Sequence, residues 1–431
     1  MRPIAGAVVL GVVGCWAPAL IVTSGGCHAS QAGSSGGSAG SSSSGSSSSG
    51  ASSGSSSGQS SSASSSSGTS SSGSSSSGSP DGGTSFPGQP GNPVGYSAYG
   101  ALGTKPWPGG GFTSGTASQP TKYTGYVFTG QQDISGSYIE FVSCDFDSGT
   151  DGVDVTGSNI TFKGCRFQSN STGNYNVQTS GANLSFSYCS FVPLASFYQA
   201  PPGAAWPSAG AGKNTTTQAP GVNAIDGNDG YQYGLAINSG GPVTADHNDF
   251  WGFGNDGPQF MDTTAQITIT DNWIHDAASA SPQGYHIDGL GYVNGGAGPS
   301  NVLIQHNTIA SIGNTNGIAF QAATSGYGNI QMSDNYLSGF GYLVALGTAG
   351  NQQLAGSKFT NNVIGTDLQW IFGPIYDDYT TVFGGNGNTW SGNTLRVLPG
   401  TTPAGTSNFT FATAQSGYYL WPDSSLHTTD F

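Results

Sequence analysis

The sequence predicts an all-β solenoid, a parallel β-helix of about 8–10 coils, from two observations. First, a short segment of alternating apolar residues, ending in Cys or Asn and one more apolar residue, recurs along the chain. Its copies begin at Ile139, Ile160, Leu184, Val243, Ile267, Val302 and Ile330, with weaker copies at Phe359 and Thr389. Second, the Cys or Asn position recurs at intervals close to one coil: Cys144 and Cys165 lie 21 residues apart, and Asn248 and Asn272 lie 24 apart.

Each copy is expected to form a strand with one face inward, because its apolar residues alternate with period two. The residues between copies hold a second short strand, as at 152–155 and 317–321, followed by glycine-rich turns. One coil therefore consists of a strand, a turn, a strand, a tight bend at Cys or Asn, a short strand and a loop. Such coils stack with successive strands about 4.8 Å apart.

Stacking places equivalent positions of successive coils above one another. Cys144, Cys165 and Cys189 are then expected to form a small apolar column, since a free Cys behaves as a buried hydrophobe. The later Asn residues are expected to form a ladder of side-chain amides bonded along the stack and to the bends. A metal site at the three Cys is less favoured, because their spacing is that of the repeat and no Cys-x-x-Cys occurs. A disulfide between two of them remains an alternative in an oxidising compartment.

On these repeats the chain resembles the right-handed parallel β-helix superfamily of pectate-lyase-like and polygalacturonase-like proteins. The resemblance covers roughly residues 123–395. It implies the architecture and leaves the activity open, because this scaffold hosts many chemistries.

The regions outside the repeat are expected to serve secretion, tethering and capping. Residues 1–27 are predicted to form a lipoprotein-like signal peptide. Residues 28–85 are predicted to form a disordered Ser/Gly linker, because they have no apolar surface to bury. Residues 86–122 are expected to lead in and cap the first coil of a β-helix domain at 123–397, and 398–431 to cap the last coil. A long insertion at about 193–231 is expected to wall a cleft.

The N-terminal segment contains two cysteines that resemble bacterial lipoprotein cleavage sites. Cys15 follows a better-matching first position, whereas Cys27 leaves a longer apolar region and directly precedes the linker, so lipid attachment at Cys27 is favoured. Ordinary signal cleavage without a lipid is the alternative. We expect a secreted or cell-surface protein, lipid-anchored to the bacterial outer membrane if Cys27 is modified, with no other membrane contact.

The chain is acidic and has few charged residues. It has 22 acidic against 8 basic residues, a net charge of −14 and only 7% charged residues. This composition excludes nucleic acid as an expected partner, because such binding needs basic patches. A polyanionic glycan would need Ca²⁺ to bridge its carboxylates. No cofactor is required by a motif, Ca²⁺ is an alternative, and we expect a monomer.

The best candidate for chemistry is the segment 283–289, which contains His286 and Asp288. Alternation places Ile287 inward, so these two residues share the outward face. Glycoside hydrolysis generally uses two carboxyl groups, and Asp288 is expected to pair with Asp256 or Asp276. His286 would tune the proton balance, and His275 enters the same region. For Asp256 or Asp276 alone, a turn role is favoured; for His286 with Asp288, function is slightly favoured.

Substrate-binding residues are expected on the same face in neighbouring coils. Gln259 precedes the candidate segment, Gln321 follows it, and Asn238 lies two coils before it; Tyr285 and Tyr292 would stack on sugar rings. The His-x-Asp-Gly segment also resembles the Asn-x-Asp-Gly of polygalacturonases. That family's Gly-His-Gly and Arg-x-Lys motifs are missing here, so its mechanism is not carried over.

Three functions are consistent with these features. The leading hypothesis is a secreted, surface-tethered enzyme that degrades a polysaccharide or cell-surface glycan. Hydrolysis is slightly preferred to elimination, because carboxylates are plentiful and the Arg or Lys of a lyase is scarce. The alternative is a non-catalytic, glycan-binding or adhesin-like surface protein. A Ca²⁺-dependent epimerase is a weaker third hypothesis.

Overall fold

The computed structural model describes residues 85–88, 91–149, 152–169, 175–193, 233–261, 265–275, 277, 287–293, 300–311, 315–321, 327–346, 354–365, 373–376, 387–397 and 410–413. The chain divides into two units, 1–73 and 74–431, and every described residue belongs to the second. The predicted signal peptide, most of the linker and nearly all of the insertion lie outside the described residues. Within the described part of the chain, no helix has the length and apolar character needed to cross a membrane.

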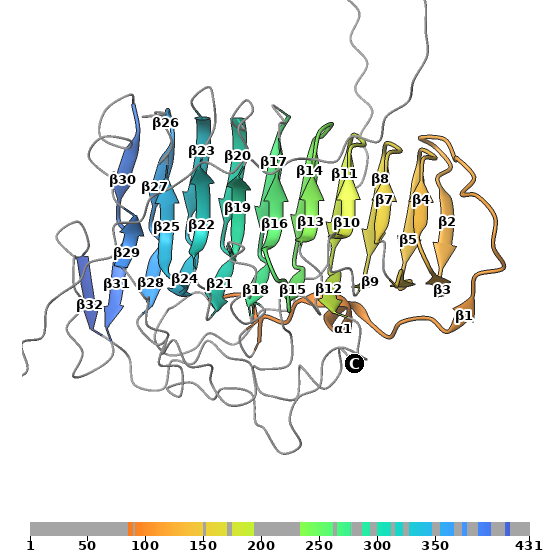
Figure 1. The fold of residues 1–431 in the computed structure, drawn as a ribbon, viewed down its shortest axis with the longest axis horizontal. Coiled ribbons are helices and arrows are strands. Elements are labelled where there is room, and N and C mark those ends of the chain that lie inside the picture. The colour runs from red at the N-terminus through yellow and green to blue at the C-terminus, as the bar shows by residue number, and fades with distance from the viewer. Residues whose placement is uncertain are drawn as a thin grey trace, which may run out of the picture. The chain divides into compact units, whose positions relative to one another are not determined.

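The fold consists of three parallel sheets, built from strands of successive coils (Figure 1). The 12-stranded sheet contains, in spatial order, β1 (Lys105–Pro106), β3 (Tyr126–Thr129), β6 (Asp145–Asp147), β9 (Arg166–Ser169), β12 (Ser190–Pro193), β15 (Asp249–Trp251), β18 (Trp273–His275), β21 (Thr308–Ser311), β24 (Tyr336–Gly339), β28 (Val363–Gly365), β31 (Thr394–Val397) and β32 (Thr410–Thr413). The 9-stranded sheet contains β4 (Gln132–Ile134), β7 (Val153–Val155), β10 (Tyr175–Thr179), β13 (Tyr233–Ile237), β16 (Asp256–Phe260), β19 (Leu290–Val293), β22 (Asn316–Gln321), β25 (Tyr342–Leu346) and β29 (Gly373–Tyr376). The 11-stranded sheet contains β2 (Thr121–Thr124), β5 (Ile139–Val142), β8 (Ile160–Lys163), β11 (Leu184–Ser187), β14 (Val243–Asp246), β17 (Ile267–Thr270), β20 (Ser300–Gln305), β23 (Tyr327–Ser333), β27 (Lys358–Thr360) and β30 (Thr389–Ser391), with β26 (Leu354–Ala355) paired to β23.

Each coil passes from the 11-stranded sheet to the 12-stranded sheet and then to the 9-stranded sheet, which confirms the predicted β-helix. The first passage is the tight bend predicted at Cys or Asn. The residue just before that Cys or Asn adopts a positive φ, as at His247 (55°) and Asp271 (55°). This left-handed conformation turns the chain sharply while the next residue points inward.

The predicted column of Cys and Asn residues is present. The backbone N–H of Cys189 donates to Asn248 Oδ1 at 2.8 Å. Asn248 donates from both its backbone and its side chain to Asn272 Oδ1, at 2.8 and 2.9 Å. The same paired donation continues through the later rungs, in the order Asn272 to Asn307, Asn335, Asn362 and Asn393. Cys144, Cys165 and Cys189 are free and buried, so no disulfide joins them.

The interior of the first coils is filled by stacked phenylalanines. Phe141 stacks on Phe162 with ring centroids 5.0 Å apart, and Phe162 stacks on Phe186 at 4.8 Å. In the middle coils the equivalent positions are aliphatic and fully buried, as at Ile269 and Ile304, and in the last coils Phe359 stacks on Trp390. Both halves therefore share one continuous core.

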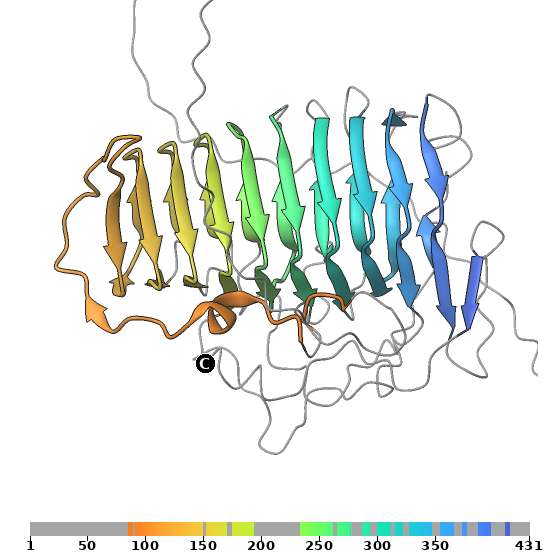
Figure 2. The same cartoon turned by 180° about the vertical axis from the view of Figure 1, so that it is seen from behind.

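Two parts of the N-terminal lead-in cover different surfaces. Trp107 and Phe112 stack on each other and pack against the core at the first coil. The earlier residues 85–88 and 91–99, here called the N-terminal strap, include the short helix α1 (Gly95–Tyr99) and run along the ends of several coils (Figure 2). The strap reaches far along the solenoid, because Thr308 Oγ1 donates to the carbonyl of Pro87 at 2.7 Å.

Candidate functional site

Two acidic side chains meet on neighbouring rungs of the 9-stranded sheet. Asp256 begins β16, Asp288 lies just before β19, and the two residues form a parallel β-bridge. Neighbouring strands of a sheet lie about 4.8 Å apart. The structure therefore brings together the pair that the sequence suggested, Asp288 with Asp256.

Both side chains lie on the outward face of the sheet. Ile287 and Leu290 are core residues, so Asp288 points away from the core. A Cβ built on Gly291 would lie 3.6 Å from the Cβ of Asp288, which places these two positions on one face. Gln259 Nε2 donates to Asp256 Oδ2 at 2.6 Å, which places Gln259 beside Asp256 on the same face.

The two carboxyl groups differ in their surroundings, although both are completely buried. Burial, and then the charge of Asp288, raises the pKa of Asp256 well above its ordinary value. Asp288 Oδ1 accepts hydrogen bonds from the backbone N–H and the side-chain amide of Asn316, both at 2.8 Å. Such bonds favour a negatively charged acceptor. Burial therefore favours the protonated form of Asp256, and the two bonds from Asn316 favour the carboxylate form of Asp288.

The sequence prediction placed Gln259 and Gln321 on the outward face of Asp288 in the neighbouring coils, without giving the register. Along the stack, Asp288 aligns with Asp256 and Asn316. Gln259 aligns instead with Gly291 and Ala319.

The reason is a local break in alternation, since Asp256 and Gln259 are three residues apart and yet share a face. A Cβ at Gly257 would point into the core, 3.1 Å from Ile274.

A column of glycines makes this break possible. Gly234, Gly257, Gly289 and Gly317 follow one another along the stack, and a Cβ on Gly257 would lie only 2.5 Å from the carbonyl oxygen of Gly289. The signal in the sequence is a polar residue followed by Gly at the start of successive strands: Asp256-Gly257, Asp288-Gly289 and Asn316-Gly317. We had assigned the first of these to an ordinary turn, and Asn316 was missed altogether.

Two of the remaining predicted site residues, His275 and Asn238, are described and do not lie at the carboxyl pair. His275 lies in the 12-stranded sheet, where its Nε2 is 2.7 Å from Asp249 Oδ1 and both side chains are buried. Asn238 follows β13 and is half-buried. Gln321 ends β22, and Tyr292 takes the register position of the core residues Phe260 and Phe320. The side chains of Gln321 and Tyr292 lie outside the described residues, as do residues Tyr285, His286, Asp276 and Cys27 entirely.

One group of side chains in the described structure is close enough to share a metal ion, and it lies elsewhere. It consists of Asp246, His247 and Asp271, at the bends between the 11-stranded and 12-stranded sheets. The three buried cysteines do not form such a group. Burial raises the pKa of Cys165 well above its ordinary value, which disfavours the thiolate that a metal would need.

Comparisons with known proteins found similarity to right-handed β-helix proteins. The model of the right-handed β-helix region matches residues 221–325. Similar solved structures include the pectate lyase Pel9A, with 16% identity, a TM-score of 0.40 and coverage of 68% of this chain and 70% of that chain. A mannuronic acid specific polysaccharide family 6 lyase from human gut microbiota has 14% identity and a TM-score of 0.36. The match covers 73% of this chain and 83% of that chain.

The tailspike protein gp49 of Acinetobacter baumannii bacteriophage Fri1, a capsular polysaccharide depolymerase, has 12% identity, a TM-score of 0.27 and coverage of 71% and 50%. A search of curated proteins found no match. The three parallel sheets, the coil order and the matching family model together identify the repeat region of this chain as a right-handed parallel β-helix.

Proposed function

We propose that the protein is a surface-tethered, polysaccharide-degrading enzyme that hydrolyses glycosidic bonds, with Asp256 as the general acid and Asp288 as the partner carboxylate. The observation that carries the proposal is the pair itself. Two carboxyl groups meet on adjacent rungs, and the raised pKa of Asp256 keeps a proton beside the hydrogen-bonded Asp288. In many enzymes the surroundings of two carboxyl groups push their pKa values apart, so that one group acts as the acid and the other as the base or nucleophile.

The spacing of the rungs favours one form of hydrolysis. Retaining glycosidases hold their carboxyl groups about 5–5.5 Å apart, whereas inverting ones leave room for a water at about 6.5–9.5 Å. Asp256 and Asp288 stand on neighbouring strands, about 4.8 Å apart along the stack. In the proposed reaction Asp256 protonates the leaving oxygen and Asp288 attacks the sugar, before water releases the glycosyl group with Asp256 as base.

Elimination fits the chain less well. Lyases generally use an Arg or Lys near the substrate carboxylate, and the whole chain has only 8 Lys and Arg residues. Both carboxyl groups are fully buried, so the proposed reaction requires that they become accessible to the substrate.

The test is a panel of neutral and acidic polysaccharides incubated with the full chain, with and without Ca²⁺. New reducing ends report hydrolysis, and ultraviolet absorbance of unsaturated ends reports elimination. We expect reducing ends without absorbance, and a loss of at least about 1,000-fold in rate for Asp288→Asn and Asp256→Asn. Asp334→Asn is the control, because Asp334 is a half-buried acid at the bend after β23, outside the 9-stranded sheet, where it is bonded to Gln305.

The hydrolase proposal fails if Asp288→Asn is as active as the wild type while circular dichroism shows both folded. It also fails if the products absorb in the ultraviolet.

A second candidate function, glycan binding without cleavage, is favoured by the exposed part of the same sheet. Asp133, Asp154 and Gln178 line a shallow depression of about 340 Å³. Their polar groups are ordered by neighbours, since Gln131 Nε2 lies 3.3 Å from Asp133 Oδ1 and 3.2 Å from Asp154 Oδ2. Saturable glycan binding that Asp154→Asn weakens, with no new reducing or unsaturated ends, would support binding and exclude cleavage.

A further inference from the structure

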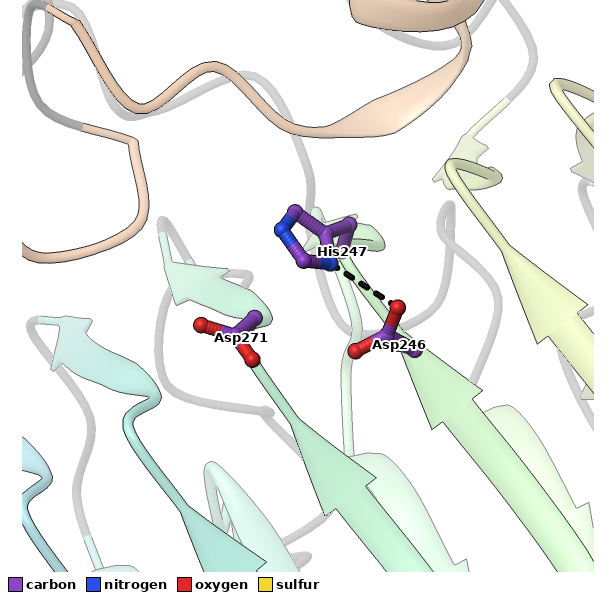
Figure 3. A group of neighbouring side chains, drawn as sticks. All are labelled: Asp246, His247 and Asp271. Carbon is purple, nitrogen blue, oxygen red and sulfur yellow. Dashed lines mark hydrogen bonds and ion pairs between the residues drawn. The ribbon is translucent and has the colours of Figure 1, made fainter. Parts of the chain in front are cut away.

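A mixed group of carboxylates and an imidazole lies at two neighbouring bends, apart from the Asp256–Asp288 pair. Asp246 ends β14, His247 is the bend residue after it, and Asp271 is the bend residue after β17 (Figure 3). One potential ligand atom of each lies within 4.8 Å of the other two. The bends repeat with the rung, so His247 and Asp271 share a backbone conformation, with φ of 55° for both.

The ligand atoms are held in place by neighbours. His247 Nδ1 lies 2.9 Å from Asp246 Oδ2, and Thr270 Oγ1 donates to Asp246 Oδ1 at 2.8 Å. The ring of His247 stacks on Tyr188 with centroids 4.7 Å apart and planes 27° apart. The imidazole is therefore oriented by a neighbouring rung on one side and faces the carboxylates on the other.

Asp271 has its own supporting partner on the following rung. His306 Nδ1 lies 2.5 Å from Asp271 Oδ1, which leaves Oδ2 outside this bond. Metal-binding carboxylates in proteins are generally oriented by such outer hydrogen bonds. The ring of His306 is in turn stacked on Phe86 of the N-terminal strap, with centroids 5.5 Å apart.

The group has an excess of negative charge that a cation would offset. In the described structure the ion pairs of Asp246 and Asp271 are with imidazoles, His247 and His306, and not with Lys or Arg. The side chains of Asp246, His247 and Asp271 are 35%, 26% and 29% exposed, so an ion can reach them while they are partly shielded from water.

We propose that Asp246, His247 and Asp271 bind one divalent transition cation of the zinc class. Imidazole nitrogen together with carboxylate oxygens suits Zn²⁺ and its neighbours, whereas Ca²⁺ and Mg²⁺ take oxygen ligands. Three protein ligands leave one tetrahedral position for water. The site does not involve Asp256 or Asp288, so it stands or falls independently of the proposed hydrolase activity.

Such an ion would cross-link consecutive rungs. It would join the bend after β14 to the bend after β17, next to the strap, whose Gly95 N–H donates to the carbonyl of His247 at 2.9 Å. A ligand that binds only the folded state stabilises it, so Zn²⁺ is expected to raise the melting temperature.

The test is calorimetric titration of the full chain, stripped with a chelator, with Zn²⁺ and separately with Ca²⁺. His247→Asn and Asp271→Asn are suitable variants, because Asn361 occupies the same bend position with φ of 55°. The matched control is Asp334→Asn, since Asp334 is an acidic bend residue with φ of 58° whose side chain is bonded to Gln305. We expect one Zn²⁺ per chain, affinity lower by about 100-fold or more in both variants, and no change in the control.

Three outcomes would overturn the proposal. The first is the absence of stoichiometric Zn²⁺ binding. The second is equal affinity in wild type, His247→Asn and Asp271→Asn, which would place the metal elsewhere on the chain. The third is binding of Ca²⁺ in preference to Zn²⁺. The melting temperature distinguishes lost metal binding from lost folding. Without metal, both variants should melt close to the wild type, and the rise with Zn²⁺ should be absent.

Discussion

The first and the later coils use the same bend but stabilise it differently. At Cys144, Cys165 and Cys189 the bend is filled by a thiol, which makes only long contacts such as Cys165 Sγ to the carbonyl of Lys163 at 3.5 Å. From Asn272 to Asn393, each side-chain oxygen in the ladder accepts two hydrogen bonds from the preceding Asn, one from its backbone N–H and one from its side-chain amide. The comparison shows that packing with stacked phenylalanines can replace a hydrogen-bonded ladder in one solenoid.

The outward face of the 9-stranded sheet differs between the same two regions. Asp133 is exposed and Asp154 half-exposed in the first coils, whereas Gln259 and Ala319 at matching outward positions are buried. Among the described residues of this sheet, only the later coils carry a pair of adjacent carboxyl groups that is shielded from water. This difference, more than residue type, separates the candidate catalytic carboxyls from ordinary surface acids.

The largest expected effect comes from breaking the ladder in its middle. Asn307→Ala removes the acceptor of two bonds from Asn272 and the donor to Ile269 and Asn335. Buried polar groups left without partners cost about 1–3 kcal/mol each, so we expect a loss of about 4 kcal/mol in the free energy of unfolding. Urea denaturation measures it.

The control for the ladder is Gln266→Ala, at an exposed position beside the same sheet, for which a change within about 0.5 kcal/mol is expected. A loss below about 1 kcal/mol in the free energy of unfolding for Asn307→Ala would show that the amide hydrogen bonds contribute little to the stability of the stacked coils.

The next expected effect is on the pH dependence of stability. The pKa of Asp256 is raised in the folded protein, so the folded state holds a proton that the unfolded state releases above its own lower pKa. Stability therefore falls as pH rises from the unfolded value of about 3.9 through the higher folded value. Asp256→Asn should remove this fall and stabilise the protein at neutral pH, as measured by denaturation between pH 4 and pH 8.

Gln266→Ala changes an exposed position without a titratable group, so this control should keep the pH profile of the wild type. Equal profiles for the wild type and Asp256→Asn would show that the carboxyl pair does not hold the extra proton.

The smallest expected effect is at the Cys column. Cys165→Ala removes one buried sulfur and no strong hydrogen bond, so we expect a loss of about 1 kcal/mol, from packing alone. Thermal or urea unfolding of Cys165→Ala and Asn307→Ala under identical conditions makes the comparison direct. A loss at Cys165 as large as at Asn307 would contradict the view that the two halves are stabilised by different forces.

Much of the fold was predictable from sequence because a solenoid repeats its own constraints. The apolar alternation at Ile139, Ile160 and Leu184, and the recurrence of Cys or Asn, specify a strand followed by a bend in every coil. These signals are local, and stacking converts them into columns without further information. The Asn ladder was therefore predicted down to its weaker copies, Asn362 and Asn393.

The candidate site was predictable only in part. Asp256 and Asp288 were proposed as a pair from their chemistry, but their register depended on Gly257 and Gly289, which interrupt alternation. His275 was grouped with them because it is near in sequence, whereas the fold places it in another sheet beside Asp249. Residues that are two positions apart share a face only where the strand alternates regularly.

The order of residues along this polypeptide was enough to define a stacked, three-sided coil and the identity of its bend positions, because those features arise from short-range periodicity. Three-dimensional folding alone settled which polar side chains lose contact with water and which become neighbours. Burial and proximity depend on coil length, on glycines that let backbones approach closely, and on a strap that joins residues 221 positions apart. These are long-range quantities, and no local pattern encodes them.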